Sequence, residues 1–374
     1  MKCAVAGLGV GMAHVAGYLT HRRCELVAVA DPWQPRRGAT AGTFAQGSML
    51  DMRRLFEDRA IPQDFLDSTW QAAGIRVYES AQDLAADAEI ELVSLCTPDD
   101  THATLIHNLL AAGKYVLAEK PVSLTAADAR AIADLPGAQE RLAVGYEFRV
   151  NPAVQALKQR IDDGELGTVR AVSLHHYRTP FRRDKWQAWI QDPARSGGLV
   201  VEETCHWFDL VAWLAGDRIA TVHCVGVDDI HADFAYEDLA YVQGRYRRGG
   251  AWQIAHSLSG FDFSLVIQVH GSRAGAWLAL KDAPYSALDA GASDHCAVLS
   301  VGLHNQGPTD AQVKTWGVEA TEPYSIRDSV HAVVDSFLHN NAPPAGVAAG
   351  RDSLLAALGA RESLVSGHQI TIEE

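Results

Sequence analysis

Short apolar runs alternate with helical patterns through the first 146 residues of the chain. The runs are rich in Val, Ala and Leu, as buried strands are, and the segments between them repeat apolar positions at helical spacing. Strands that alternate with helices form a parallel sheet covered by helices on both faces. We therefore predict an α/β domain with a doubly wound sheet over residues 1–146. Its expected strands are 2–6, 25–30, 76–78, 91–96, 115–118 and 141–146, and its expected helices are 11–21, 103–112 and 125–134.

Beyond Pro152 the pattern changes to β-runs that follow one another with few helices between them. Long runs joined by short polar turns are typical of an antiparallel or mixed open sheet. We predict a second α/β domain over residues 147–374, with a large, open, mostly antiparallel sheet. A C-terminal helix and strand, about 350–374, can pack back on the first domain. The expected strands are 168–177, 219–228, 238–247, 251–259, 264–270 and 275–280, and the expected helices are 152–163, 199–214, 325–339 and 350–365.

An insertion separates the second and third strands of the first domain. It covers residues 33–75, which is long for a crossover connection, and it contains a helical stretch near 49–59. The pattern assigns this insertion no role.

A glycine turn lies between the first strand and the first helix. Gly7 permits a tight turn, Gly9 lets the backbone approach a pyrophosphate, and the helix N-terminus stabilises the charge of that group. Asp31 ends the second strand roughly 20 residues downstream, where it can accept both hydroxyls of an adenosine ribose. Met12 stands where the dinucleotide motif has its third glycine, and Gly11 lies one residue early. The turn, the helix and the acid together predict a dinucleotide site, and a simple strand-to-helix turn is the alternative.

Composition narrows the class of protein. The 374 residues, of which 48% are hydrophobic and 21% charged, suffice for two domains with their own cores. A net charge of -14 without a long basic stripe argues against nucleic acid and anionic membrane as partners. We expect a cytoplasmic protein, because the sequence shows no signal peptide and no apolar run near the roughly 18 residues that cross a bilayer. Its six scattered cysteines, without a Cys-x-x-Cys pair, indicate reduced structural thiols.

The apolar run 116–118 ends at Glu119, Lys120 and Pro121, where a nucleotide-binding sheet presents side chains to its ligand. With this segment the chain resembles the Gfo/Idh/MocA oxidoreductases, named for glucose-fructose oxidoreductase and inositol dehydrogenase, over nearly its whole length. The string Gly-Lys-x-Val-x-x-Glu-Lys-Pro is the most specific part of the resemblance. Its carriers are Gly7-Leu-Gly9, Asp31-Pro32, Thr97-Pro98 with His102, the stretch from Ala111 to Pro121, Arg149 with Pro152, Gly164-Glu-Leu-Gly167, and Ser196-Gly197-Gly198 before His206 and Asp209.

The resemblance implies a Rossmann domain that holds NAD or NADP. It also implies a C-terminal domain whose open sheet covers the nicotinamide and joins subunits into homodimers or homotetramers. Most members oxidise or reduce a sugar or cyclitol carbinol, which makes a small carbohydrate the expected substrate. Their catalytic Lys, Asp and His correspond here to Lys120, Glu202 and His206, so the glutamate departs from the family pattern.

Cofactor choice leans to NAD, because Asp31 would repel a 2′-phosphate. Arg36 and Arg37 follow closely and could accommodate NADP. Thr97, Pro98 and His102 are expected to shape the cofactor loop rather than do chemistry. The predicted cofactor-binding residues are Gly7, Gly9, Gly11, Met12, Asp31, Thr97, Pro98, His102, Glu119 and Lys120.

Oxidation of a carbinol needs a base for the hydroxyl proton and a group that stabilises the developing alkoxide. His206 suits the first role, because an unperturbed histidine has a pKa of roughly 6.5, and Lys120 suits the second. Glu202, His206 and Asp209 follow helical spacing along one face, so either carboxylate could fix the tautomer of His206. A metal held by these three residues is an alternative that the family does not need, and we expect no metal.

Four cations and two tryptophans are concentrated in residues 177–189. In an acidic protein these cations could steer an anionic sugar, and the tryptophans could stack on its ring. A solvated loop is the alternative. The predicted substrate-binding residues are Arg149, Arg178, Arg182, Lys185 and Trp186.

The leading functional hypothesis is an NAD(P)-dependent dehydrogenase or reductase of a sugar, sugar derivative or cyclitol. The first rival is an NAD-dependent glycoside hydrolase that works by transient C3 oxidation, elimination and re-reduction, and the altered carboxylate Glu202 keeps it open. The second rival is a non-catalytic NAD(P) sensor, against which the presence of both Lys120 and His206 weighs.

Overall fold

The structure is a computed structural model of the chain. It describes residues 1–38, 40, 61, 63–178, 188–231, 234–260, 263–281, 295–304, 312–318 and 325–373. The helical stretch expected near 49–59, with most of the insertion at 33–75, lies outside the described residues.

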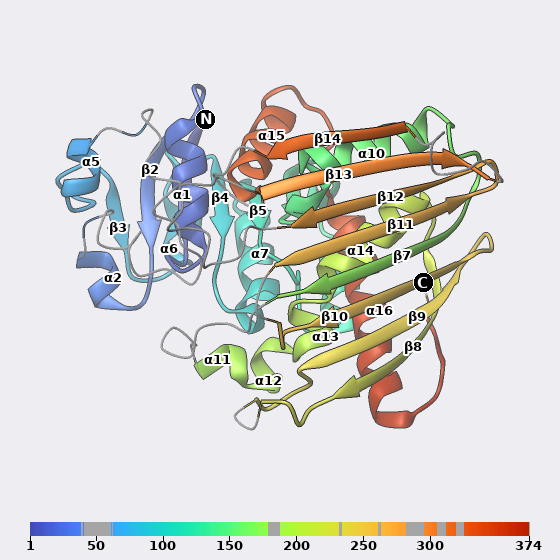
Figure 1. Cartoon of the computed structure of the whole chain (residues 1–374). Coiled ribbons are helices and arrows are strands. Elements are labelled where there is room, and N and C mark those ends of the chain that lie inside the picture. Colours follow the sequence, from blue (N-terminus) through green and yellow to red (C-terminus); the bar gives the residue numbers. More distant parts are fainter. Residues whose placement is uncertain are drawn as a thin grey trace.

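Six parallel strands form the first sheet, in the order β3-β2-β1-β4-β5-β6 (Figure 1). The chain begins in the middle, runs outward through β2 and β3, and then crosses to the other side of β1 at β4. Where the strand order reverses, the carboxyl ends of β1 and β4 open a crevice that binds ligands in sheets of this type. The strands are β1 (Lys2–Ala6), β2 (Glu25–Ala30), β3 (Arg76–Tyr78), β4 (Leu92–Leu95), β5 (Tyr115–Ala118) and β6 (Leu142–Val144).

Helices cover both faces of this sheet, because alternate strand residues point to opposite sides. Cys3 and Val5 of β1 join a hydrophobic cluster with α1 (Gly11–Thr20) and α15 (Ile326–Leu338). Ala4 and Ala6 join the cluster on the other face with α7 (His102–Ala111) and α8 (Ala126–Ala133). The shorter helices of this half are α2 (Gln34–Gly38), α5 (Gln63–Asp67), α6 (Asp83–Ala86), η1 (Asp99–Thr101), α9 (Ala138–Arg141) and η2 (Glu147–Arg149).

Nine strands form the second sheet, in the order β14-β13-β12-β11-β7-β10-β9-β8-β15 (Figure 1). Strands β7 and β10 pair in parallel, and the other neighbouring pairs are antiparallel. This confirms the predicted mostly antiparallel sheet and adds two strands, β13 and β14, that the sequence pattern missed. The strands are β7 (Val169–Tyr177), β8 (Ile219–Val227), β9 (Leu239–Tyr246), β10 (Ala251–Ser257), β11 (Ser264–Gly271), β12 (Ala274–Lys281), β13 (His295–Leu303), β14 (Gln312–Val318) and β15 (Ile370–Thr371).

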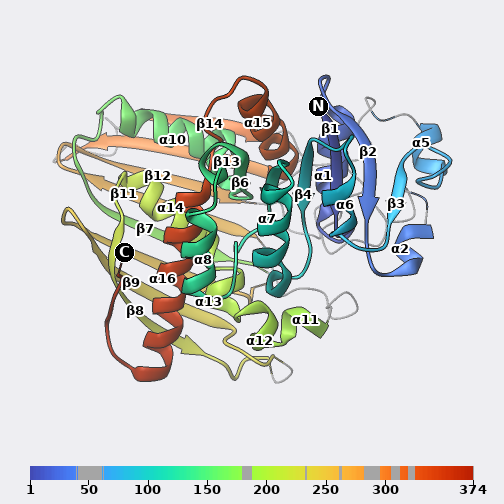
Figure 2. The ribbon, with the colours of Figure 1, turned by 180° about the vertical axis from the view of Figure 1, so that it is seen from behind.

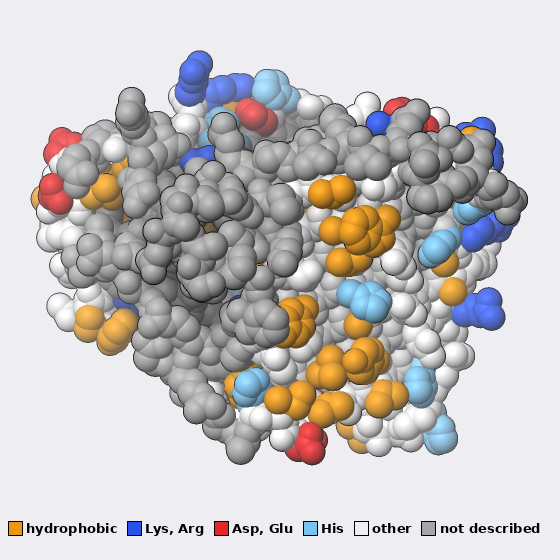
Figure 3. Space-filling model, in the orientation of Figure 1, with side chains coloured by type: hydrophobic (Ala, Val, Ile, Leu, Met, Phe, Trp, Pro, Cys, Tyr) orange, Lys and Arg blue, Asp and Glu red, His pale blue; other side chains and the backbone are white. Residues whose placement is uncertain are grey.

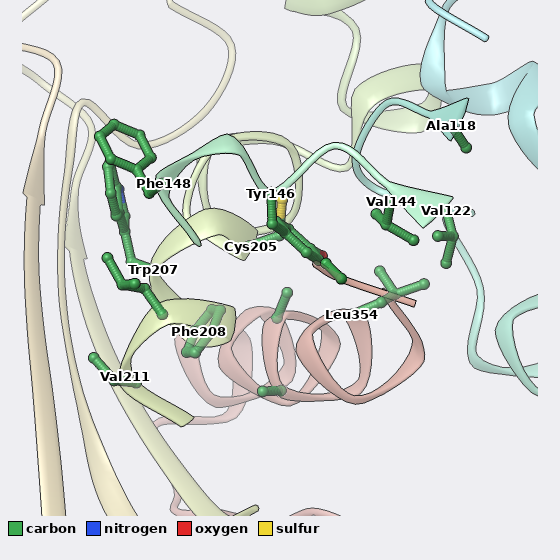
Figure 4. Close-up of a cluster of buried hydrophobic side chains, with 14 of the residues drawn as sticks. Ala118, Val122, Val144, Tyr146, Phe148, Cys205, Trp207, Phe208, Val211 and Leu354 are labelled. Carbon is green, nitrogen blue, oxygen red and sulfur yellow. The ribbon is translucent and has the colours of Figure 1, made fainter. Parts of the chain in front are cut away.

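One face of the second sheet carries helices and the other faces solvent. Helices α10 (Pro152–Asp162), α14 (Cys205–Ala215) and α16 (Val347–Ser366) lie on the covered face (Figure 2). Aromatic side chains fill the space between α14 and the rest of the core, and Figure 4 shows Tyr146, Phe148, Trp207 and Phe208 among them. None of the helices that the structure describes has the length and apolar character needed to cross a lipid bilayer.

The last two long helices return to the first domain. Helix α15 packs on α1, where a Cβ added to Gly17 would lie 2.8 Å from Val330 Cβ. Helix α16 packs on α8 and β6 as well as on β8. A Cβ at Gly350 would lie 2.6 Å from Val122 Cγ1, so this helix also approaches the first domain closely. The first sheet is therefore covered in part by the last fifty residues of the chain.

The single helix predicted over 199–214 is wrong, because the structure breaks it at Glu203 and Thr204. It forms α13 (Leu199–Glu202) and α14, after the short helices α11 (Ala188–Gln191) and α12 (Pro193–Ser196). The backbone amide and the hydroxyl of Thr204 both donate to the carbonyl of Leu199, at 2.9 and 3.1 Å. A threonine that bonds back to the preceding turn competes with helix continuation and bends the chain.

Candidate active site

The glycine turn has the backbone that a dinucleotide needs. Gly7 has φ +86°, and a Cβ there would lie 2.2 Å from the carbonyl oxygen of Cys96, so only glycine fits. Gly11 brings α1 close to the sheet, since a Cβ there would lie 2.8 Å from Val5 Cγ1. Gly11 therefore takes the close-packing role of the motif's third glycine, one residue early. The Met12 side chain is fully buried in the hydrophobic core, so a contact of Met12 with the cofactor could come only from its backbone.

Asp31 is fixed at the end of β2 by three donors. Its carboxylate accepts hydrogen bonds from the amides of Leu8 and Trp33, at 2.8 and 2.9 Å, and from Arg36 at 3.3 Å. The Arg36 guanidinium also lies over the ring of Trp33, 5.2 Å from its centroid. Arg37 instead bonds the backbone carbonyls of Asp31 and Pro32.

The backbone around the glycine turn leaves room for the diphosphate of a dinucleotide. No side chain in the described part of the chain caps the N-terminus of α1 and no acid stands in its first turn, which leaves that end of the helix open to an anion. Of the described residues, a Cβ at Gly9 would approach only the Arg36 side chain, at 3.9 Å, so these residues leave the backbone of Gly9 open.

Two backbone carbonyls hold His102 between the ends of β4 and β5. Its Nδ1 lies 2.7 Å from the carbonyl oxygen of Pro121, and its Nε2 lies 2.8 Å from that of Thr97. A carbonyl oxygen only accepts, and burial lowers the pKa of His102, so the neutral ring donates to one of these two oxygens at a time. His102 can thus help to fix the loop that contains Thr97 and Pro98.

Lys120 and Glu202 meet across the two domains. The Lys120 ammonium donates to the Glu202 carbonyl oxygen at 2.7 Å and to Oε1 of the same residue at 2.8 Å. The helix break after Glu202 leaves that carbonyl free of the α-helical bonding pattern. An ammonium has three hydrogens, so one remains for a substrate oxygen.

Nearby carboxylates keep the buried Lys120 side chain protonated. Burial lowers the pKa of Lys120, but the carboxylates of Glu202, Glu203 and Asp99 outweigh burial and raise it well above the ordinary value. Burial raises the pKa of the Glu202 carboxyl to about 7, because Lys120 offsets only part of the cost of desolvation. The buried Asp99, which sequence reasoning missed, also has a raised pKa, from burial and the nearby Glu202.

His206 faces Glu147 rather than either carboxylate predicted to orient it. Its Nδ1 lies 3.4 Å from Glu147 Oε2, an ion-pair distance without hydrogen-bond geometry. Burial and the charge of Lys120 lower the pKa of His206 to about 3, so the imidazole is neutral near pH 7. Glu147 lies three residues after the end of β6, and its position shortly after a strand is the signal that could have identified it.

Asp209 is wrong as an orienter of His206. Its carboxylate forms a two-pronged ion pair with Arg149, at 2.6 and 2.8 Å. Arg149 also donates to the carbonyl of Pro344 and lies over the ring of Trp213. This buried ion pair joins α14 to η2. Both carboxylate oxygens of Asp209 bond Arg149 rather than the imidazole of His206, and Arg149, predicted to bind substrate, has a structural contact here.

Arg178 is paired with Glu203, the residue at the helix break. The closest approach is 3.2 Å, and both side chains are about nine-tenths buried. Burial raises the pKa of Glu203, but Arg178 and Lys120 outweigh it and lower the pKa to about 2. Three other predicted substrate-binding residues, Arg182, Lys185 and Trp186, lie outside the described residues.

No three His, Cys, Asp or Glu side chains in the described part of the chain are arranged to hold a metal ion. The three side chains considered as metal ligands point to different partners. Glu202 pairs with Lys120, His206 lies near Glu147, and Asp209 pairs with Arg149.

Comparison with protein families gives two matches along the chain. Residues 1–146 match the model described as "Oxidoreductase family, NAD-binding Rossmann fold", and residues 154–276 match the "GFO/IDH/MocA C-terminal domain". Among curated relatives, inositol 2-dehydrogenase of Rhizobium meliloti is 28% identical over 292 residues, which cover 76% of this chain and 77% of the relative. Myo-inositol 2-dehydrogenase of Thermotoga maritima is 26% identical over 231 residues, 60% of this chain and 67% of the relative.

Solved structures share the whole fold. Levoglucosan dehydrogenase in complex with NADH and levoglucosan superposes with a TM-score of 0.75 at 15% identity, covering 100% of both chains. Scyllo-inositol dehydrogenase from Lactobacillus casei, with NAD(H) and scyllo-inositol, gives a TM-score of 0.69 at 16% identity, covering 100% of this chain and 99% of the other. The dehydrogenase hypothesis is supported by the family matches, and the glycoside-cleaving alternative gains no support from them.

Proposed function

The chain belongs to the Gfo/Idh/MocA oxidoreductases, and from this premise we propose that it interconverts a carbinol and a ketone on a sugar or cyclitol with NAD. The observation that carries the proposal is the Lys120 ammonium, buried at the crevice with two hydrogen bonds to Glu202 and one hydrogen left over. The names of the inositol dehydrogenases among the relatives support a polyhydroxylated ring as the substrate class.

The residues divide the work of oxidation between them. Bound NAD would supply the hydride acceptor, held by the glycine turn, the N-terminus of α1 and Asp31. Lys120 donates a hydrogen bond to the reacting oxygen and stabilises the charge that develops there. His206, neutral near pH 7, would take the hydroxyl proton. Glu202 holds the ammonium in position with both its carbonyl and its carboxylate.

Cofactor preference follows from the end of β2. The buried Asp31 carboxylate would repel a 2′-phosphate, which favours NAD. Arg36 lies against that carboxylate and partly neutralises it, so NADP remains a secondary cofactor in the proposal.

The decisive experiment follows NADH formation in the purified protein with a panel of cyclitols and sugars, myo-inositol and scyllo-inositol included. Lys120→Met should lower kcat on the substrate found by roughly a thousandfold, because it removes the donor to the reacting oxygen. NADH affinity, measured by fluorescence titration, should stay within about threefold of the wild type, since Lys120 contributes to the reaction more than to cofactor binding.

Lys2→Met is the matched control, because Lys2 lies at the opposite end of the first sheet, in an exposed pair with Glu89. It should leave both measurements unchanged. Full turnover by Lys120→Met would remove the proposed role of the lysine. Tight NADH binding without turnover of any carbinol in the panel would contradict the proposed substrate class.

We also propose that the open face of the second sheet binds a second copy of the chain, as a homodimer or within a tetramer. The face carries apolar and histidine side chains (Figure 3). Two rows of registered residues cross six strands on this face without any Asp, Glu, Lys or Arg. An uncharged, solvent-facing surface of this extent in an acidic protein is typical of an interface. The rows are Val225, Tyr241, Ala255, His175, Val266 and Ala279, and His223, Gln243, Gln253, Ser173, Gln268 and Trp277.

A further inference from the structure

A buried chain of hydrogen bonds connects the cofactor-binding helix to the residue before the catalytic lysine. The hydroxyl of Tyr18 lies 2.6 Å from Ser94 Oγ, which lies 2.9 Å from His14 Nδ1. His14 Nε2 in turn lies 2.9 Å from Glu119 Oε1. Tyr18 and His14 belong to α1, Ser94 to β4, and Glu119 directly follows β5. Neither the sequence motif nor the proposed mechanism uses His14.

The direction of this chain follows from counting hydrogens. A Glu119 carboxylate can only accept, so the proton of the imidazole lies on Nε2 of His14. With a neutral ring, Nδ1 accepts from Ser94, and Ser94 accepts from Tyr18, so every hydrogen is used. A doubly protonated ring would leave one buried hydroxyl hydrogen, that of Ser94 or that of Tyr18, without an acceptor among the described residues, which costs free energy.

The surroundings of Glu119 leave its carboxylate little freedom. A Cβ at Gly145 would lie 2.9 Å from Glu119 Oε1, so the glycine after β6 makes room for the group. Burial raises the pKa of Glu119, but the hydrogen bond from His14 and the charge of Lys120 outweigh burial and leave the pKa below its ordinary value. The other titratable groups that sense its charge are Cys96, Asp99, His102 and His206.

We propose that His14 is a positioning residue: through Nε2 it holds Glu119 as an oriented anion facing the bound dinucleotide, next to Lys120. The proposal rests on the proposed NAD-dependent function. It makes α1 serve the cofactor at two points, with its N-terminus at the diphosphate and with His14 behind the carboxylate at the nicotinamide end. A neutral imidazole also does this without placing a second cation beside Lys120.

The test measures NADH affinity by fluorescence titration between about pH 4 and pH 8, a range that reaches the acid limb expected for Glu119, and does not need a known substrate. His14→Leu removes the donor to Glu119. It should weaken NADH binding by about tenfold, the usual loss for a hydrogen bond to a charged group. Because the lost bond lowered the pKa of Glu119, the carboxyl protonates at higher pH in this variant, and the acid limb of binding should move up by about one pH unit.

Two further variants separate positioning from packing. His14→Gln can still donate an N–H toward Glu119 and should recover most of the affinity and the pH profile. Glu119→Gln should abolish the acid limb, and adding His14→Leu to it should cause little further loss. His107→Leu, on the exposed side of α7, is the control and should match the wild type.

Wild-type affinity and pH profile in a folded His14→Leu would overturn the proposal. So would an acid limb that stays in Glu119→Gln, or a His14→Gln that binds no better than the leucine variant. Should His14→Leu fail to fold, the comparison of His14→Gln with Glu119→Gln still decides the matter. Failure of the proposed enzymatic function is a separate result: all carbinols would remain unoxidised while NADH binding kept its dependence on His14.

Discussion

At the scale of single residues, the carboxyl group that differs from the family pattern is the one that contacts Lys120, the proposed catalytic lysine. Glu202 offers Lys120 both a carbonyl and a carboxylate oxygen, and the carbonyl is available because the helix breaks just after it. The extra methylene of glutamate lets one residue reach the ammonium twice. The family's aspartate could not be expected to make the same pair of contacts from the same backbone.

Glu202→Gln tests whether this carboxylate must ionise. Burial raises the pKa of Glu202 to about 7, so the group is neutral at acid pH and becomes an anion as the pH rises through that value. We expect kcat/KM of the wild type to rise across the same range, and the glutamine variant to lose this limb and be roughly tenfold slower at about pH 8. Measured profiles of kcat/KM against pH check both points, and Glu202→Asp should keep the limb. An unchanged profile in Glu202→Gln would assign the ionisation to another group.

Single residues also show which contacts of the candidate site the sequence can indicate and which it cannot. Lys120, Glu202 and His206 were predicted from the motif, and the structure brings Lys120 and Glu202 into contact. Glu147 and Glu203 were missed, because their roles depend on a turn after β6 and on a helix break. Periodicity cannot reveal such a break, since the threonine that causes it competes locally with a pattern that continues on both sides.

At the scale of elements, the contact between α1 and α15 depends on a missing side chain. Gly17 lets the two helices approach so closely that a Cβ there would lie 2.8 Å from Val330. Most strands and helices of both domains were predicted from apolar runs, but this pairing was not. It joins segments more than three hundred residues apart, and no local pattern records which partner covers a helix.

Gly17→Ala should therefore destabilise the protein by about 1–3 kcal/mol, since an added methyl in a close-packed contact forces the helices apart. Val330→Ala opens space at the same point and should recover part of the loss in the double variant. Gly38→Ala is the matched control, because its nearest atom is the end of the Gln34 side chain at 3.5 Å. Urea denaturation of the four variants measures these differences, and equal stability of Gly17→Ala and the wild type would contradict the close contact.

At the scale of the whole molecule, the uncharged rows of the open sheet face predict self-association. Tyr241→Arg places a charge within one of these rows, on a side chain that is 55% exposed. We expect the wild type to sediment as a dimer or tetramer at micromolar concentration and the variant to shift toward monomer, because an interface core excludes unpaired charge. Val365→Arg, 88% exposed on α16, is the control and should not change sedimentation. A monomeric wild type would remove the proposed interface.

The return of α15 and α16 to the first domain has a consequence for how the chain is made. Residues 1–146 leave the ribosome first, yet the surface of α1 that packs on Val330, and part of α8, remain bare until the C-terminal helices have been synthesised. At the usual rate of roughly 5–20 residues per second this takes tens of seconds. During that time the nascent N-terminal half exposes apolar surface to chaperones and to neighbouring nascent chains, and a message that ends before residue 326 yields a product whose first domain never gains its cover.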